Sequence, residues 1–314
     1  MKKIPVVAVV GPTASGKTAL SVELAKVFDG EIVSADSMQI YKSMDIATAK
    51  PTEEERQGIE HHLMDFLDPT ESFSVAAYCE LARRAIEDIA SRSKLPIITG
   101  GTGLYVDSLL SNIHFSEISG DEQLRKSLFD RIEREGVTPL LDEIRSFDPA
   151  SYERLKEGKN PKRIVRCIEV YTLTGKTQTH LNAEALSVDT PYQALKIGLK
   201  SCDRQFLYDR INRRVDEMMH HGLIEEAQAF FDQNIGATAS MAIGYKELKP
   251  YFDNEKTLEE CIENLKQQTR RYAKRQLTWF LRDKDIFWFD IDQMRFEEIL
   301  GRSITLIKEH LHEE

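Results

Sequence analysis

The chain has 314 residues, 41% hydrophobic and 30% charged, a composition typical of a globular protein with one large or two modest cores. It contains no apolar run near the ~20 residues of a membrane-spanning helix, no secretory signal pattern at its start and no Cys-x-x-Cys zinc pair among its four cysteines. We therefore expect a cytoplasmic protein with buried thiols, and the net charge of −10 argues against a general affinity for nucleic acid.

The first recognisable motif is a phosphate-binding loop, Gly11-Pro12-Thr13-Ala14-Ser15-Gly16-Lys17-Thr18, which follows an apolar run over 5–10. Its spacing, G-x-x-x-x-G-K-[ST], predicts a buried strand, a tight loop and the start of a helix. The two glycines allow backbone N–H groups to converge on an anion, and Lys17 and the helix N-terminus add positive charge. The Thr18 hydroxyl can bind a Mg²⁺ ion that bridges two phosphates. The motif predicts a di- or triphosphate ligand without specifying which one.

Two further strand ends carry polar residues or glycines. We expect a second strand over 31–36 that ends at Asp36, a helix over 73–93, and a third strand over 95–99 followed by the glycine-rich turn around Thr102. In doubly wound sheets, ligands bind just beyond the carboxyl ends of the strands. Asp36 and Thr102 are therefore predicted to lie near the phosphate loop.

The middle of the chain has a different pattern from its ends. We expect helices separated by Gly or Pro over 121–135, 138–146, 149–157 and 161–174, and strands again at 192–200 and 286–289. The predicted fold class is α/β, a P-loop NTPase-like parallel sheet core with helices on both faces. Residues 1–114 and 191–314 would form this core, and residues 115–190 an all-helical insertion domain.

Positive charge is concentrated in two segments despite the acidic total. From 264 to 282 there are six basic residues and no acidic ones, and from 159 to 176 there are five basic residues and one acidic one. A long helix is expected over 258–282, with two columns of cations: Lys266, Arg270 and Lys274, then Arg271 and Arg275. Because no acid lies nearby in the sequence, we expect a polyanion to bind this face, with Tyr272 and Trp279 as stacking surfaces.

Two other features have structural interpretations. The neighbouring pair His61-His62 falls in an irregular stretch and cannot face one metal ion, so we expect a structural or solvent-facing role. A helix over 203–221 carries four arginines, among them Arg214, beside an apolar stripe. For any one of these arginines, a solvated face with local acid partners is as good an interpretation as a binding role.

Several stretches together resemble the tRNA dimethylallyltransferase (tRNA isopentenyltransferase) family. The resemblance covers nearly the whole chain and rests on GPTASGKT at 11–18, DSMQIY at 36–41, GGTGLY at 100–105, NPKRI at 160–164, RRVDEM at 213–218, AIGYKE at 242–247 and KRQLTW at 274–279. Met241 is a departure, since many relatives have glutamine there. The resemblance implies transfer of a dimethylallyl group from its diphosphate to N6 of the adenosine 3′ of the anticodon, with release of diphosphate.

The resemblance also implies roles for individual residues. Asp36 would take the proton of the amine, Thr102 would help to place the base, and Lys17 and Arg214 would stabilise the departing diphosphate. The diphosphate site would comprise Gly11, Pro12, Thr13, Ala14, Ser15, Gly16, Lys17, Thr18 and Arg214, with Thr18 as the Mg²⁺ ligand. The tRNA-binding residues would be Asp36, Ser37, Met38, Gln39, Thr102, Pro161, Lys162, Arg163, Ile164, Val165, Arg270, Arg271, Lys274 and Arg275. The implied partners are a tRNA anticodon stem-loop and dimethylallyl diphosphate, without a membrane, and we expect a monomer.

Three other functions are compatible with parts of the pattern. A small-molecule kinase would use the same loop with Asp36 as base for a hydroxyl, but it does not need the helical insertion or the cationic helix. An isopentenyltransferase acting on free AMP would show no salt-dependent binding to an anticodon stem-loop. A non-catalytic RNA-binding module would leave Asp36 without a role, so that Asp36→Ala would not change turnover.

Overall fold

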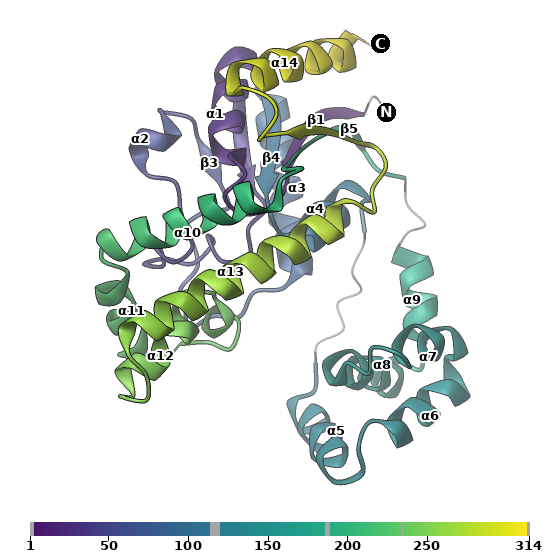
Figure 1. Ribbon diagram of the computed structural model, residues 1–314. Coiled ribbons are helices and arrows are strands. Elements are labelled where there is room, and N and C mark those ends of the chain that lie inside the picture. Colours follow the sequence, from purple (N-terminus) through teal and green to yellow (C-terminus); the bar gives the residue numbers. More distant parts are fainter. Residues whose placement is uncertain (1–2, 114–119, 186–188, 234, 313–314) are drawn as a thin grey trace. The chain divides into compact units, whose positions relative to one another are not determined.

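The computed structural model describes residues 3–113, 120–185, 189–233 and 235–312 (Figure 1). The chain divides into two compact units, one formed by 1–110 with 190–314 and the other by 111–189. The predicted boundary between 114 and 115 falls outside the described residues.

The first unit is built on a parallel sheet with the strand order β3-β2-β4-β1-β5-β6 among the described residues. The strands are β1 (Ile4–Val10), β2 (Gly30–Ser34), β3 (His61–His62), β4 (Leu95–Gly100), β5 (Tyr192–Lys200) and β6 (Ile286–Asp290). Residues Val6 to Val10 of the central strand β1 are at most 1% exposed. Such a continuous apolar run suits a parallel strand that is covered on both faces. The predicted α/β class is confirmed.

Helices cover both faces of this sheet because successive connections run in opposite directions. The chain passes from β1 to β2 through α1 (Lys17–Phe28) and, after the edge strand β3, returns from β3 to β4 through α3 (Val75–Ser91). Right-handed crossovers in opposite directions place these two helices on opposite faces. On the face of α1, Val7 shares a buried cluster with Leu20 and with residues of α14 (Phe296–His312). Figure 1 shows α1 and α14 beside each other over the sheet.

The described part of this unit contains further helices beyond α1, α3 and α14. They are α2 (Glu53–Arg56), α4 (Gly103–Leu110), α10 (Arg204–His220), α11 (Leu223–Phe231), α12 (Tyr245–Phe252) and α13 (Leu258–Phe280), with a 3₁₀ turn η1 (Ala239–Met241). Helices α10 and α13 lie side by side and pack through Leu207, Ile211 and Ala273 (Figure 1). The sequence expectations do not include α11, α12 or α14; α11 and α12 have only nine and eight residues, too few for a helical period to stand out.

The described part of the second unit contains only helices, as expected from its sequence. They are α5 (Glu122–Glu135), α6 (Thr138–Phe147), α7 (Pro149–Leu155), α8 (Pro161–Thr174) and α9 (Gln178–Ala185). The first four begin and end within two residues of the expected positions, whereas α9 was not expected because Leu181 is its one buried residue. Leu140, Ile144 and Ile164 lie at the centre of the core that these helices share.

Two expectations about local structure are wrong. The His61-His62 pair forms β3 beside β2 and is not irregular; the His62 Nε2 atom lies 2.7 Å from the buried Glu31 carboxylate, so its structural role stands. Cys202 is exposed in the loop after β5, whereas the other three thiols are buried.

Within the described residues, no helix combines the length and apolar character that crossing a membrane requires.

The end of β4 yields a stability prediction. A Cβ atom on Gly100 would lie 2.1 Å from the carbonyl oxygen of Ala35, whereas one on Gly301, inside α14, would meet no atom within 4 Å. We expect Gly100→Ala to lower the free energy of unfolding by at least about 2 kcal/mol through overpacking. Gly301→Ala should raise it by about 0.5–1 kcal/mol, because alanine loses less entropy in a helix. Urea unfolding of both variants measures the difference, and equal effects would contradict this account of Gly100.

Candidate active site

The phosphate loop connects β1 to α1 in a conformation that only glycine adopts readily at two positions. Gly11 has φ 145° and Gly16 has φ 93°. A Cβ atom on Gly11 would lie 2.4 Å from the Leu199 carbonyl oxygen, so the loop sits directly against the end of β5. Lys17, in the first turn of α1, reaches back and donates from Nζ to the Pro12 carbonyl oxygen at 2.7 Å. The loop thus curves around the ammonium group of Lys17.

A cleft of about 320 Å³ opens beside this loop. Its walls come from the loops after β1, β2 and β4, the 47–49 segment, α10, the 241–246 segment and α13. Of the predicted site residues, those that line it are Thr13, Lys17, Thr18, Asp36, Ser37, Met38, Gln39, Arg214 and Arg275. All of these lie within the first unit, so residues far apart in the sequence converge on one site.

Asp36 is held at the cleft by the loop that carries it. Its Oδ1 atom accepts hydrogen bonds from the backbone N–H groups of Met38 at 2.9 Å and Gln39 at 3.3 Å. The Thr102 hydroxyl does not line the cleft; it accepts a bond from the Ser37 N–H at 3.1 Å. Thr102 therefore fixes the loop next to the carboxylate.

Arg214 joins the phosphate loop to the opposite wall. Its two Nη atoms donate to the Thr13 hydroxyl at 3.1 Å and to the Ala49 carbonyl oxygen at 3.3 Å. One turn earlier on α10, Arg210 donates to the Ala14 carbonyl oxygen at 2.8 Å. Of the two interpretations of these arginines, the solvated face does not describe Arg214, which is half-buried at the cleft, whereas Arg210 is exposed and bonds to a backbone oxygen.

The cleft holds more positive than negative charge. Burial, followed by the nearby Arg214 guanidinium, lowers the pKa of Lys17 to about 7, against the opposing effect of Asp36. Burial likewise lowers the pKa of Arg214. Burial destabilises the charged form of both groups, and Arg214 further destabilises that of Lys17, so an anion that enters the cleft is favoured because it opposes these effects.

Gln276 of α13, which was not predicted as a site residue, connects two loops of the cleft. Its Oε1 atom accepts from the Thr13 N–H at 2.9 Å, and its Nε2 atom donates to the Gly101 carbonyl oxygen at 3.0 Å. Gln276 is only 6% exposed. A polar residue in the buried stripe of a long helix is the signal that could have identified it. It ties the loops after β1 and β4 to the cationic helix.

The cationic face of α13 is narrower than expected. Lys266 pairs with Asp216 of α10 at 2.8 Å and with Glu263 at 3.4 Å, so the expectation that it has no acidic partner is wrong. Arg270 donates to the Asn212 side chain at 2.6 Å. Arg271 and Lys274 are exposed, as is Arg275 at the edge of the cleft.

In the second unit, the predicted tRNA-binding residues begin α8. The Asn160 side chain caps the helix, and Pro161, Lys162 and Arg163 are exposed. Ile164 and Val165 are buried in the core of this unit, so their side chains serve packing. The exposed residues of this first turn are the ones available to a partner.

A family model described as IPP transferase matches residues 39–283. The tRNA dimethylallyltransferase of Bacillus subtilis (strain 168) is 48% identical over 291 residues, covering 92% of this chain and 91% of that protein. The tRNA dimethylallyltransferase of Thermoanaerobacter sp. (strain X514) is 45% identical over 304 residues, covering 96% of each.

Solved structures agree with these sequence matches. The full-length tRNA isopentenylpyrophosphate transferase from Bacillus halodurans has 43% identity and a TM-score of 0.75, covering 99% of this chain and 98% of that chain. A eukaryotic dimethylallyltransferase described as acting on tRNA has 30% identity and a TM-score of 0.83, covering 98% of this chain and 79% of that chain.

The environment of Lys17 predicts a pH-dependent affinity for anions. Its pKa is about 7 in the free protein, and a bound diphosphate raises that pKa by stabilising the ammonium. The contribution of Lys17 to affinity is therefore complete below pH 7 and declines as the pH rises above 7, by at most about tenfold per pH unit. We expect the ratio of inorganic diphosphate affinities, wild type over Lys17→Met, to fall across this range in calorimetric titrations. The ratio cancels the ionisation of the ligand itself, and a constant ratio would contradict the assignment.

Proposed function

The chain belongs to the IPP transferase family, and from this premise we propose that it transfers a dimethylallyl group from dimethylallyl diphosphate to N6 of the adenosine 3′ of the anticodon in tRNA. The observation that carries the proposal is a phosphate loop and a carboxylate facing one cleft, in a chain that matches tRNA dimethylallyltransferases over nearly its whole length.

The diphosphate of the donor would lie among the backbone N–H groups of residues 11–18. Lys17 and Arg214 both line the cleft and would contact the phosphate oxygens. As the bond from C1 to the bridging oxygen breaks, negative charge grows on that oxygen and the allyl fragment becomes cationic. Donors already aimed at the oxygen lower the barrier, because they need no reorganisation when the charge develops.

Mg²⁺ would bind through hard oxygen donors at the same place. Thr18 lines the cleft, and Mg²⁺ prefers oxygen ligands such as its hydroxyl together with those of the substrate phosphates. When bound, the ion would neutralise charge on the diphosphate.

Asp36 would accept the proton released from the adenine amine. The N6 lone pair is delocalised into the ring, so a carboxylate that orients the amine and removes its proton assists formation of the N6–C1 bond. The bonds from Met38 and Gln39 occupy Oδ1 and hold the carboxyl group in place. Thr102 would act through the Ser37 N–H, keeping the Asp36 loop against the end of β4.

The tRNA would present the adenosine with its base out of the stack, at a cost of a few kcal/mol. Phosphate contacts can offset this cost. Arg271, Lys274 and Arg275 on α13 are exposed and would supply them, as would Lys162 and Arg163 in the helical unit, which we propose as a tRNA-contacting domain. We propose a monomer as the active form.

The assignment of Asp36 is tested by Asp36→Asn. Asparagine keeps an oxygen that can accept the Met38 and Gln39 N–H groups but loses the charge and basicity of the carboxylate. We expect transfer of labelled dimethylallyl to tRNA to fall by about 10²–10⁴-fold while tRNA binding stays close to wild type. Asp68→Asn is the control, because that carboxylate bonds to Thr70 on the surface. Undiminished transfer by Asp36→Asn would remove Asp36 from the mechanism, and label passing from ATP instead would favour a kinase.

The role of α13 is tested by Arg271→Ala and Lys274→Ala. Each should weaken tRNA binding and lower the slope of log affinity against log salt by about one, if each residue contacts one phosphate. Lys308→Ala, on the exposed side of α14, is the matched control and should leave the slope unchanged. Filter binding over a salt series measures all three slopes, and identical slopes would exclude this face from the tRNA site.

A further inference from the structure

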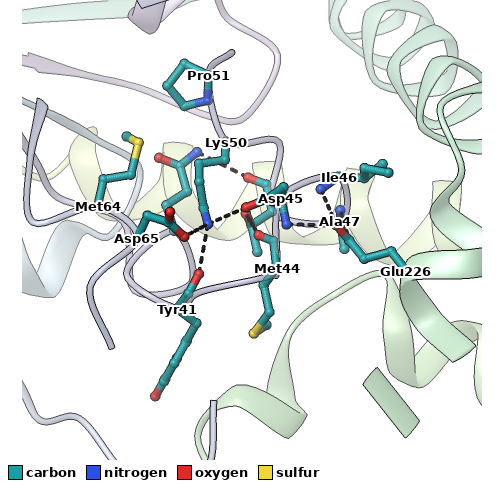
Figure 2. Close-up of polar contacts among 12 residues, drawn as sticks. Tyr41, Met44, Asp45, Ile46, Ala47, Lys50, Pro51, Met64, Asp65 and Glu226 are labelled. Carbon is teal, nitrogen blue, oxygen red and sulfur yellow. Dashed lines mark hydrogen bonds and ion pairs between the residues drawn. The ribbon is translucent and has the colours of Figure 1, made fainter. Parts of the chain in front are cut away.

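One wall of the cleft is a single tight turn formed by residues 45–50, which we call the 45–50 turn (Figure 2). The Lys50 N–H donates to the Asp45 carbonyl oxygen and the Ala49 N–H to the Ile46 carbonyl oxygen, both at 2.9 Å. Ala49 has φ 50°. This is the pattern that ends a helix, here around one turn only. Such an isolated turn does not hold its shape without external contacts.

Glu226 of α11 supplies those contacts at the start of the turn. One carboxylate oxygen, Oε2, accepts the N–H groups of Asp45 and Ile46, both at 2.8 Å. The other, Oε1, accepts the Ala47 N–H at 2.9 Å. Figure 2 shows the carboxylate facing these successive amides. Converging amides at the start of a helical turn favour a negative charge, so the carboxylate both aligns the turn and stabilises it.

The same carboxylate reaches the neighbouring wall. The Tyr245 hydroxyl donates to Glu226 Oε1 at 2.8 Å, and its ring stacks on Phe230, one helical turn after Glu226. Tyr245 follows Gly244, where a Cβ atom would lie 2.7 Å from the Ala47 side chain. Gly244 and the 45–50 turn therefore pack closely, and Glu226 contacts both this turn and Tyr245, the residue after Gly244.

At its other end, the 45–50 turn holds two side chains of the cleft. The Gln39 Nε2 atom donates to the Thr48 carbonyl oxygen at 3.2 Å and to the Ala49 carbonyl oxygen at 3.0 Å. Arg214 donates to the same Ala49 oxygen. Lys50 fastens this end through Asp65 and the Tyr41 carbonyl oxygen (Figure 2). A continuous series of contacts thus runs from Glu226 through the turn to Gln39 and Arg214.

We propose that Glu226 is a positioning residue for the transfer reaction, which it serves without touching substrate. Its carboxylate fixes the 45–50 turn so that the carbonyl oxygens of Thr48 and Ala49 hold Gln39 beside Asp36 and Arg214 beside the phosphate loop. The inference rests on the proposed function only for its kinetic consequence. The effect on the turn itself is independent of that function.

The substitution that isolates this role is Glu226→Gln. Each carboxylate oxygen accepts two hydrogen bonds. A glutamine has one oxygen and one NH₂ group, so one orientation sets the NH₂ against the N–H groups of Asp45 and Ile46. The other sets it against the Ala47 N–H, while the Tyr245 hydroxyl can turn to accept. The variant keeps the shape and the apolar contacts of the side chain. Glu225→Gln, an exposed residue in the same helical turn, is the matched control.

The first measurement is amide hydrogen exchange of the intact protein, read on a proteolytic fragment that spans residues 42–51. We expect Glu226→Gln to accelerate exchange at the amides of 45–47 and Glu225→Gln to leave it unchanged. This readout needs no catalytic activity. Unchanged exchange in Glu226→Gln would overturn the proposal even if the proposed function holds.

The second measurement is transfer of dimethylallyl to tRNA well below the unfolding temperature of each variant. We expect Glu226→Gln to lower kcat/KM by about tenfold or more, since small displacements of binding groups are costly, and Glu225→Gln to match wild type. In a double-mutant cycle, the fold-loss of kcat/KM caused by Glu226→Gln should be smaller in the Gln39→Ala background. Gln39, one of the side chains that Glu226 positions, is already absent there. Equal losses in both backgrounds would show a merely structural role. A wild-type protein without transfer activity would refute the proposed function but leave the exchange result standing.

Discussion

The close approach of Ala35 to Gly100 is the constraint on which the cleft depends. Because Gly100 has no side chain, the Ala35 carbonyl oxygen lies against the end of β4 and accepts the Thr102 N–H at 3.1 Å. That bond joins the loops after β2 and β4. Since all the strands run parallel, these loops meet the phosphate loop at one edge of the sheet. Asp36 and Lys17 thereby come to line one cleft, although the strands that precede them are not neighbours in the sheet.

Electrostatics explains how an acidic protein can bind anionic substrates. The net charge is −10, yet the cleft collects Lys17 and Arg214 around a single carboxylate, and α13 presents exposed cations next to it. Local fields act over about one Debye length, so a cluster of cations outweighs acids placed elsewhere. The lowered pKa of Lys17 reflects first its burial and then the nearby Arg214 guanidinium, and a bound diphosphate would oppose both effects.

The loops of the cleft are held in position by side chains that take no part in the proposed reaction. Gln276 connects the phosphate loop to the end of β4 and comes from α13, whose exposed face carries the cations proposed for tRNA. Glu226 fixes the 45–50 turn from α11. Both are polar side chains that bond mainly to backbone groups, with the Tyr245 hydroxyl as a further partner of Glu226. Positional accuracy in this cleft therefore rests on a few side chains that bind backbone groups of its loops.

The sequence by itself determined the strand–loop–helix at 11–18, the later strands and the helices of the middle segment, because these depend on local spacing of glycine, proline and apolar residues. It also indicated Asp36, since a polar residue after a buried strand has a predictable place. Only the tertiary structure decided the partners of Lys266, the packing of Ile164 and Val165, and the roles of Gln276 and Glu226. Those contacts join residues that are far apart along the chain, and Glu226 comes from a helix that was not predicted. Local periodicity carries no information about which distant backbone groups a side chain will contact. These contacts are therefore defined only by the tertiary structure.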